Sequence, residues 1–196
     1  MPTLRDIVGL PATPAPLSES ALILIDCQNT YRDGVMQLVN VEEALKHARS
    51  LLDRARAAGV PVFHVQHDAG AGSPYDLSAE NGQIADSVAP APGEPVIVKN
   101  FPDSFAATRL QQELESVGCK NLILTGFMSH MCVNSTARSA FDRGYAVSIV
   151  ENATATRDLP DGKGGVISAA DVQKASLCGL ADLIAVVVDD QSEIPD

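Results

Sequence analysis

Short apolar runs recur along this chain, and each is long enough for one β-strand. The first is ALILID at Ala21–Asp26, and PVFHVQ, PVIVK, NLILTG, AVSIVE and LIAVVV follow it at Pro61–Gln66, Pro95–Lys99, Asn121–Gly126, Ala146–Glu151 and Leu183–Val188. A continuous apolar run indicates a strand covered on both faces, because a strand with one face in water alternates apolar and polar residues. Such strands are typical of parallel sheets.

Segments with helical periodicity lie between these runs. Apolar residues recur every three to four positions from Val41 to Ala55, and further helices are expected at about Phe105–Val117, up to Asp142, and from about Ser168 to Leu180. Alternating strands and helices place a parallel sheet between two helical layers. The sequence therefore predicts an α/β fold with three layers, α/β/α.

Length and charge limit the classes of protein that the chain can belong to. Its 196 residues, 45% of them hydrophobic, suit a single domain at 21–196, preceded by an N-terminal arm at 1–20 whose Pro-rich part, Pro11–Pro16, should be extended. A net charge of -11 argues against nucleic acid or an anionic membrane as a partner and favours a small-molecule substrate. The amino end shows no signal-peptide pattern and no long apolar span, so a cytoplasmic location is expected.

The four cysteines show no spacing typical of a zinc site or a disulfide framework. They are Cys27, Cys119, Cys132 and Cys178, with no CxxC pair among them. In a reducing compartment most such cysteines serve as small apolar residues of the core. A reactive role for any one of them must therefore come from its position.

Three residues with useful chemistry follow strands of the predicted sheet. Asp26 ends the first run, Lys99 ends the third, and Cys132 follows Gly126 where a helix is expected to begin. Ligands of open parallel sheets bind beyond the carboxyl ends of the strands. Taken singly, the three residues could be a helix cap, a solvated lysine and a packing cysteine.

Taken together, these residues suggest nucleophilic catalysis. A thiol at a helix N-terminus beside an ammonium is stabilised as thiolate, and Asp26 could accept and later return its proton. Backbone N–H groups of the turn that holds Cys132 could bind the oxyanion of an attacked carbonyl. The sequence thus predicts both a nucleophile and an oxyanion hole in one turn.

Three separated motifs resemble the isochorismatase-like cysteine hydrolase family, which includes nicotinamidases and N-carbamoylsarcosine amidase. The motifs are LIDCQNTY with Asp26, VKNFPDSFAATRL with Lys99, and GFMSHMCVNSTARSAFDRGY with Cys132. The resemblance implies a Rossmann-like six-stranded parallel sheet and an Asp26–Lys99–Cys132 catalytic triad. It also implies a cis peptide bond between Phe127 and Met128, and an oxyanion hole made by the N–H groups of Met128 and Cys132.

The histidines depart from the nicotinamidase branch of that family. That branch carries an Asp-x-His pair and a further His that bind a metal, whereas this chain reads VQHDAGAGSPYD, with His67 alone. No metal and no other cofactor is therefore expected, because a metal site needs three or four ligands. His64 is expected to be structural, His47 to lie on the exposed side of its helix, and His130 is a candidate pocket residue.

The resulting hypothesis is hydrolysis of a small carboxamide or related C–N bond through a thioester on Cys132. The alternatives are a vinyl ether hydrolase of the isochorismatase type, which would not need the thiol, and a binding or redox-sensing protein in which Cys27 approaches Cys132. The candidate pocket residues are Gln28, Tyr31, His67, Phe101 and Phe127. Family members are often dimers or tetramers, so a homo-oligomer is expected, with the Pro-rich arm and the long Asp68–Gly93 segment as contact elements.

Overall fold

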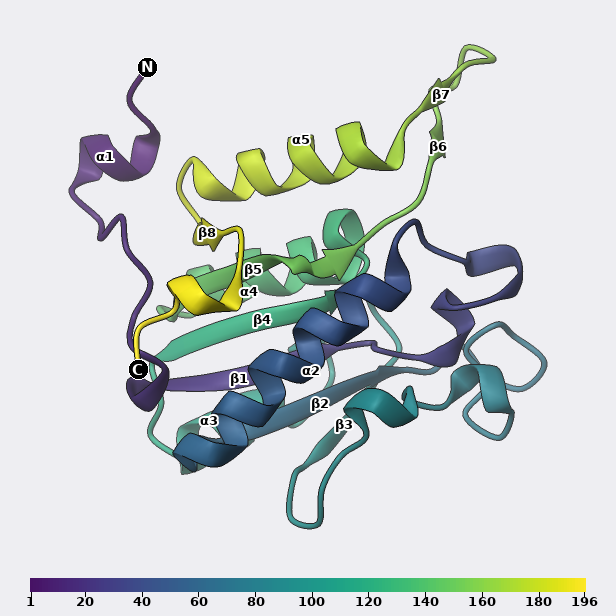
Figure 1. The fold of residues 1–196 in the computed structure, drawn as a ribbon, viewed down its shortest axis with the longest axis horizontal. Helices are drawn as coiled ribbons and strands as arrows, with labels where there is room; N and C mark the ends of the chain where they lie inside the picture. Colours follow the sequence, from purple (N-terminus) through teal and green to yellow (C-terminus); the bar gives the residue numbers. More distant parts are fainter.

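The computed structural model describes all residues from 1 to 196 and contains one six-stranded parallel sheet (Figure 1). The strands are β1 (Ser20–Ile25), β2 (Val62–His67), β3 (Val96–Lys99), β4 (Asn121–Phe127), β5 (Ala146–Ala155) and β8 (Ala185–Val188). Their order across the sheet is β3-β2-β1-β4-β5-β8, and every neighbouring pair is parallel. This confirms the sheet expected from the apolar runs.

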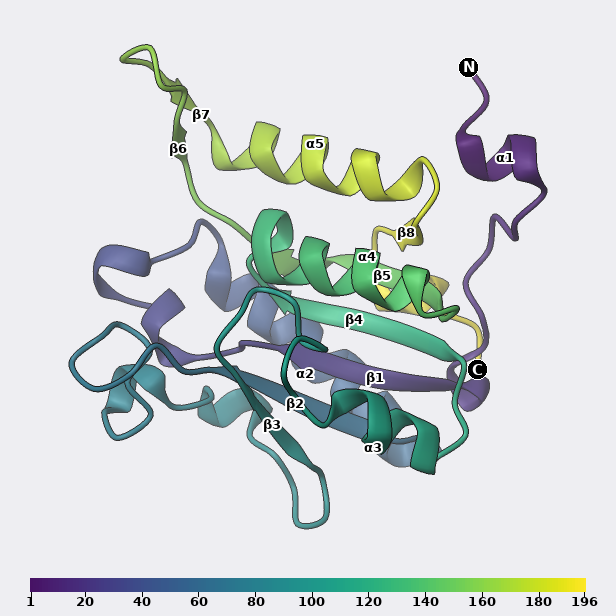
Figure 2. The same cartoon turned by 180° about the vertical axis from the view of Figure 1, so that it is seen from behind.

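Helices cover both faces of the sheet and form the outer layers. α2 (Val41–Ala58) packs on one face, whereas α3 (Leu110–Ser116), α4 (Asn134–Asp142) and α5 (Ala169–Ala181) contribute to the core on the other (Figures 1 and 2). The strands supply both cores, because successive side chains of a strand point to opposite faces. Leu22 and Leu24 face α2, whereas Ile23 and Ile25 face the opposite layer.

α2 forms where the 3.6-residue period predicts it. Its seven buried residues lie on the side that meets the sheet, and Gly59 ends the helix in the left-handed conformation that glycine adopts without strain. Full burial of one leucine side chain stabilises a fold by about 1.5–3 kcal/mol, so this apolar face accounts for the attachment of α2 to the sheet.

The chain reverses its winding direction between β1 and β4. β1 is followed outward by β2 and β3, and β4 is followed in the other direction by β5 and β8. The loops after β1 and β2 gather at one end of the sheet, on the right in Figure 1. A reversal of this kind opens a crevice beyond the carboxyl ends of the two central strands, where open α/β sheets bind ligands.

Gly126 allows β4 to approach β1 closely at this reversal. It has φ +108°, and a Cβ atom there would lie 2.0 Å from the carbonyl oxygen of Ile25. Only glycine combines that backbone conformation with so close an approach.

Three elements differ from the sequence expectations. α3 starts at Leu110 rather than near Phe105, because Ala107 adopts φ 56° and the Thr108 hydroxyl accepts the N–H of Leu110. Residues 4–8 form a helix, α1 (Leu4–Val8), which the Pro-rich opening had obscured. A hairpin of β6 (Leu159–Pro160) and β7 (Val166–Ile167) projects from the body (Figure 2).

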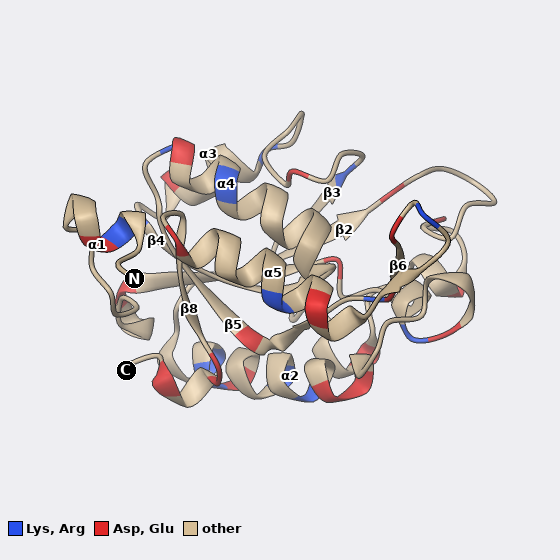
Figure 3. Cartoon of the chain, turned by 90° about the horizontal axis from the view of Figure 1, so that it is seen from above, with Lys and Arg blue, Asp and Glu red and all other residues tan.

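The N-terminal segment packs against the domain. The Arg5 guanidinium donates to the carbonyls of Pro11 and Leu183, and Leu17 is 1% exposed within the core on the α2 side. None of the helices combines the length and the apolar composition that a membrane crossing requires. In the view of Figure 3, lysine and arginine are spread over several elements rather than gathered along one continuous face.

Candidate active site at the carboxyl ends of the strands

The structure brings the three predicted catalytic side chains together. Asp26 follows β1, Lys99 ends β3, and Cys132 lies in a π-helical turn, Ser129–Val133, between β4 and α4. The Lys99 ammonium is 2.7 Å from Oδ2 of Asp26 and 3.4 Å from Sγ of Cys132. The exposed fractions of Asp26, Lys99 and Cys132 are 0%, 1% and 5%. Lys99 is therefore not a solvated lysine, and Asp26 is not a solvated residue at a strand end.

Asp26 is held in a state suited to accepting a proton. Burial raises the pKa of its carboxyl group, and the nearby Lys99 ammonium opposes that shift. Its backbone has φ 51°, an uncommon conformation for a residue other than glycine, and its Oδ1 has no hydrogen-bond partner. The unpaired oxygen leaves the carboxylate with capacity for one more donor.

The structure adds effects that oppose the thiolate form of Cys132. Burial, followed by the charge of Asp26, raises the pKa of the thiol to about 12, and Lys99 only partly opposes these effects. A raised pKa favours the neutral thiol, so a reaction that uses the thiolate needs a group that accepts the proton. Burial was not visible in the position of the cysteine after a strand, so the sequence showed only the effects that favour the thiolate.

The turn before Cys132 presents a free backbone donor. The peptide bond between Phe127 and Met128 is cis, and the Met128 N–H donates to no acceptor in the protein. The N–H groups of Met131 and Val133 both donate to the Met128 carbonyl, which fixes the turn. A free N–H beside a buried thiol is suited to binding an oxyanion.

Two of the sequence motifs are joined directly in the fold. The hydroxyl groups of Ser104 and Thr136 lie 2.8 Å apart, and the Ser104 N–H donates to the Thr136 hydroxyl. Both residues are fully buried. This contact ties the segment after Lys99 to α4, which follows Cys132.

Aromatic side chains surround the triad. Tyr31 is 1% exposed and its ring meets those of Phe127 and Tyr75 edge to face, with centroids 5.6 and 5.8 Å away. Tyr75 also meets the His67 ring edge to face, with centroids 4.9 Å apart. Tyr31, Phe127, Tyr75 and His67 thus form one aromatic cluster, and their role in binding a substrate stays a prediction.

Tyr75 is a wall residue that sequence reasoning missed. Its ring contacts that of His67, whose Nδ1 contacts Lys99, so Tyr75 lies next to the buried cluster. Burial raises the pKa of its hydroxyl. It lies in the long segment after β2, whose length indicated a functional loop but not which residue would face inward.

Two candidate pocket residues are corrected. Gln28 is fully buried, and its amide is used by the protein: its oxygen accepts the N–H of His67, and its nitrogen donates to the carbonyls of His67 and Gly82. Gln28 therefore holds the loops together and has no polar group left for a substrate. Phe101 is 54% exposed and lies outside the buried cluster.

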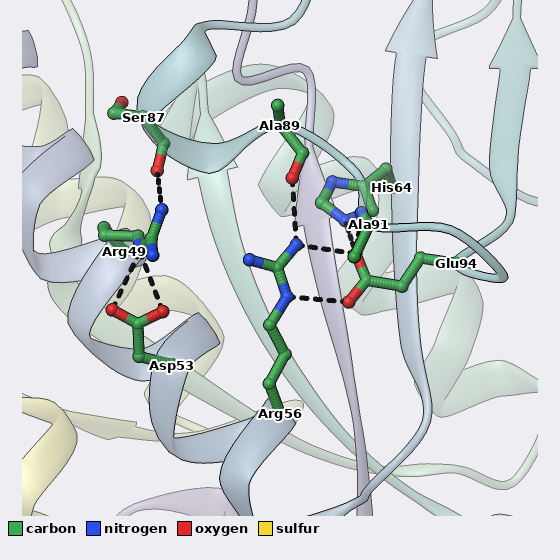
Figure 4. Close-up of polar contacts among 8 residues, drawn as sticks. All are labelled: Arg49, Asp53, Arg56, His64, Ser87, Ala89, Ala91 and Glu94. Atoms are coloured by element: carbon green, nitrogen blue, oxygen red, sulfur yellow. Dashed lines mark hydrogen bonds and ion pairs between the residues drawn. The ribbon is translucent and has the colours of Figure 1, made fainter.

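The other histidines have partners away from the thiol. His64 is buried and its Nε2 lies 2.8 Å from a Glu94 carboxylate oxygen, which confirms its structural role (Figure 4). Nδ1 of His130 lies 2.6 Å from the Thr156 hydroxyl at the end of β5. His47 is half exposed and its Nδ1 lies 3.5 Å from Asp190.

Cys27 does not share the environment of Cys132. Cys27 packs in the core on the α2 side of the sheet, whereas Cys132 packs in the core on the opposite side. The folded protein therefore does not favour the expected approach of Cys27 to an oxidised Cys132.

The fold and this buried cluster define a three-layer α/β protein with a cysteine site at the reversal point of its sheet. A family model described as Isochorismatase domain matches residues 20–191. The chain belongs to the isochorismatase family, and it is a hydrolase. This confirms the resemblance carried by the three motifs.

Individual relatives cover most of the chain. It is 36% identical to the secreted isochorismatase effector Isc1 of Verticillium dahliae, over 96% of this chain and 97% of the relative. It is 31% identical to the ureidoacrylate amidohydrolase RutB of Stutzerimonas stutzeri, over 75% of each protein. The crystal structure of an isochorismatase from Pseudomonas putida KT2440 superposes with a TM-score of 0.93 at 39% identity, covering 96% of both chains.

Proposed function

We propose that this protein hydrolyses a small carboxamide or related C–N bond through a thioester on Cys132. The observation that carries the proposal is the contact of one buried ammonium, that of Lys99, with both Asp26 and Cys132. The similarity to a ureidoacrylate amidohydrolase supports C–N bond cleavage. The burial of the three side chains favours a compact substrate.

The first half of the reaction forms the thioester. Asp26 accepts the proton of the Cys132 thiol, and the sulfur attacks the carbonyl carbon while Lys99 stabilises the resulting negative charges. The N–H groups of Met128 and Cys132 bind the carbonyl oxygen as it becomes an oxyanion. The C–N bond then breaks, and ammonia or an amine leaves with the proton that Asp26 held.

The second half releases the acid. Water attacks the thioester carbonyl and passes a proton to Asp26, and the carbon–sulfur bond breaks to give the carboxylic acid and a thiolate. Asp26 returns its proton to that thiolate, which restores the neutral thiol of the resting site.

A screen of small amides with ammonia release as the readout tests this function. Active amides should acylate Cys132, which intact-mass measurement and peptide mapping detect, and Cys132→Ala should lose about 10⁴-fold or more in kcat. Hydrolysis of amides by Cys132→Ala at the native rate would contradict the scheme.

Vinyl ether hydrolysis is the second candidate function, because the relative from Verticillium dahliae is named an isochorismatase effector. That reaction would use Asp26 and Lys99 without the thiol. A Cys132→Ala variant that retains activity on isochorismate while the native protein cleaves no amide would select this second function.

We further propose a homo-oligomer that acts on a small molecule without a metal or other cofactor. The cytoplasmic location, the absence of nucleic-acid and membrane partners, and the dimer or tetramer stay predictions from the sequence. Light scattering of the purified protein measures the oligomeric state.

A further inference from the structure

The Lys99 ammonium has a third neighbour in addition to Asp26 and Cys132. Nδ1 of His67 lies 3.1 Å from Nζ of Lys99. A lysine ammonium carries three N–H donors and no acceptor. The oxygen of Asp26, the sulfur of Cys132 and the ring nitrogen of His67 thus use all three donors.

This arrangement fixes the form of His67. Nδ1 can accept from an ammonium only through its lone pair, so the ring is neutral and carries its proton on Nε2. We propose that His67 is a positioning residue that holds the Lys99 ammonium between Asp26 and Cys132, in contact with the sulfur. This role deepens the proposed hydrolase function and rests on it.

The protein fixes His67 from two sides. The buried Gln28 amide bonds both the N–H and the carbonyl of His67, each at 2.9 Å. The edge-to-face contact with Tyr75 restrains the ring. Because Lys99 ends the adjacent strand and pairs in register with His67, both side chains leave the sheet at the same level.

The surroundings of His67 keep its ring neutral. Burial and the charge of Lys99 lower the pKa of His67 to about 4. The charge of Asp68, the residue after His67, opposes that shift. Tyr75 faces the ring from the long loop, and Asp26 and Cys132 lie on the far side of the ammonium. As the pH falls toward 4, protonation removes the acceptor at Nδ1, so the contact with Lys99 is lost on the acid side.

Replacement of the acceptor tests the role directly. His67→Phe keeps a ring without an acceptor, and His67→Asn keeps an acceptor near the position of Nδ1. On an amide found in the screen, His67→Phe should lower kcat by about 10–100-fold, as loss of an orienting partner does at metal sites, while KM changes little. His67→Asn should retain most of the native kcat.

Alkylation of Cys132 by iodoacetamide gives a readout that does not need a substrate. The Lys99 charge favours the thiolate, so its displacement in His67→Phe should slow the alkylation of Cys132 at a fixed, mildly alkaline pH, with His67→Asn close to the native protein. Peptide mapping separates Cys132 from the exposed Cys178. His47→Phe is the matched control, because His47 lies on α2 and contacts Asp190 instead of Lys99.

The outcomes separate the two proposals. Slower alkylation of Cys132 in His67→Phe, in a protein that cleaves no amide, would support the positioning role and contradict the amidase function. Amide turnover with native kcat and a native alkylation rate in folded His67→Phe would overturn the positioning role, even if its thermal stability had fallen. Should His67→Phe not fold, the same two measurements on His67→Ala decide the question.

Discussion

Gly126 sets the distance between the two central strands, and its replacement gives a residue-scale prediction. Gly126→Ala should lower the free energy of unfolding by about 3 kcal/mol or more, because the added methyl group meets the Ile25 carbonyl oxygen at 2.0 Å and φ is positive. Urea denaturation of the purified variant measures this loss.

Gly179→Ala is the matched control for that prediction. Gly179 lies within α5, and an added Cβ atom there meets nothing within 4 Å. Alanine should therefore raise the free energy of unfolding by about 0.5–1 kcal/mol through helix propensity. Equal losses in both variants would contradict the argument from the close approach of β1 and β4.

At the residue scale, the sequence indicated which side chains meet but not how they are used. Asp26, Lys99 and Cys132 could be predicted because each follows a recognisable strand of one parallel sheet. The hydrogen bonds of the Gln28 amide could not be predicted, because its partners lie on β2 and in the long loop. No local sequence pattern encodes those contacts. The protonation state of Cys132 depends on burial, which only the assembled fold determines.

At the scale of elements, a partly buried ion cluster anchors the segment that leads into β3. Glu94 bonds Arg56 of α2 through both carboxylate oxygens at 2.8 Å, accepts the N–H of Ala91 and contacts His64 of β2 (Figure 4). The cluster therefore joins α2, β2 and the end of the long loop. Its geometry sets the start of the strand that carries Lys99.

This cluster predicts a stability loss that depends on pH. The Arg56 guanidinium is the main cause that lowers the pKa of Glu94, to about 2. The stabilisation is complete above the unfolded value of 4.5 and is lost as the pH falls toward 2. Glu94→Gln should therefore cost about 1–3 kcal/mol at pH 7 and progressively less below pH 4.5.

Urea denaturation at pH 7 and at about pH 3 measures the difference between Glu94→Gln and the native protein. Glu43→Gln serves as the control, because Glu43 pairs with Lys46 on the exposed side of α2 and should change stability little. A loss in Glu94→Gln that stayed constant with pH would show that the carboxylate charge does not contribute.

Helix and strand boundaries were predictable where periodicity or apolar runs are long, as in α2 and β1. The boundaries were less predictable where a single residue decides the local backbone geometry. Ala107 delays α3 with a left-handed conformation that alanine rarely adopts, and the turn that holds Cys132 is π-helical rather than the first turn of α4. Contacts made elsewhere in the fold impose both features.

At the scale of the whole molecule, Cys27 and Cys132 pack in different hydrophobic cores. Peroxide treatment of the folded protein should therefore produce no Cys27–Cys132 disulfide, because the two side chains pack in opposite cores. Non-reducing peptide mapping measures this, and the unfolded protein in urea is the positive control. A reversible disulfide in the folded state would support the redox-sensing alternative instead.

The three-layer architecture itself was accessible from the sequence. Continuous apolar strands have to be covered on both faces, and the alternation with helices then leaves few topologies. The docking of α1 was not accessible, because it depends on Arg5 reaching the Leu183 carbonyl far along the chain.

The backbone N–H of Leu17 donates to the carbonyl of Pro195, so the two ends of the domain meet at the amino ends of the strands, away from the triad (Figure 1). The molecule can therefore be tethered to a bead or a sensor chip through either terminus, and diffusing compounds would still reach the opposite, reactive end.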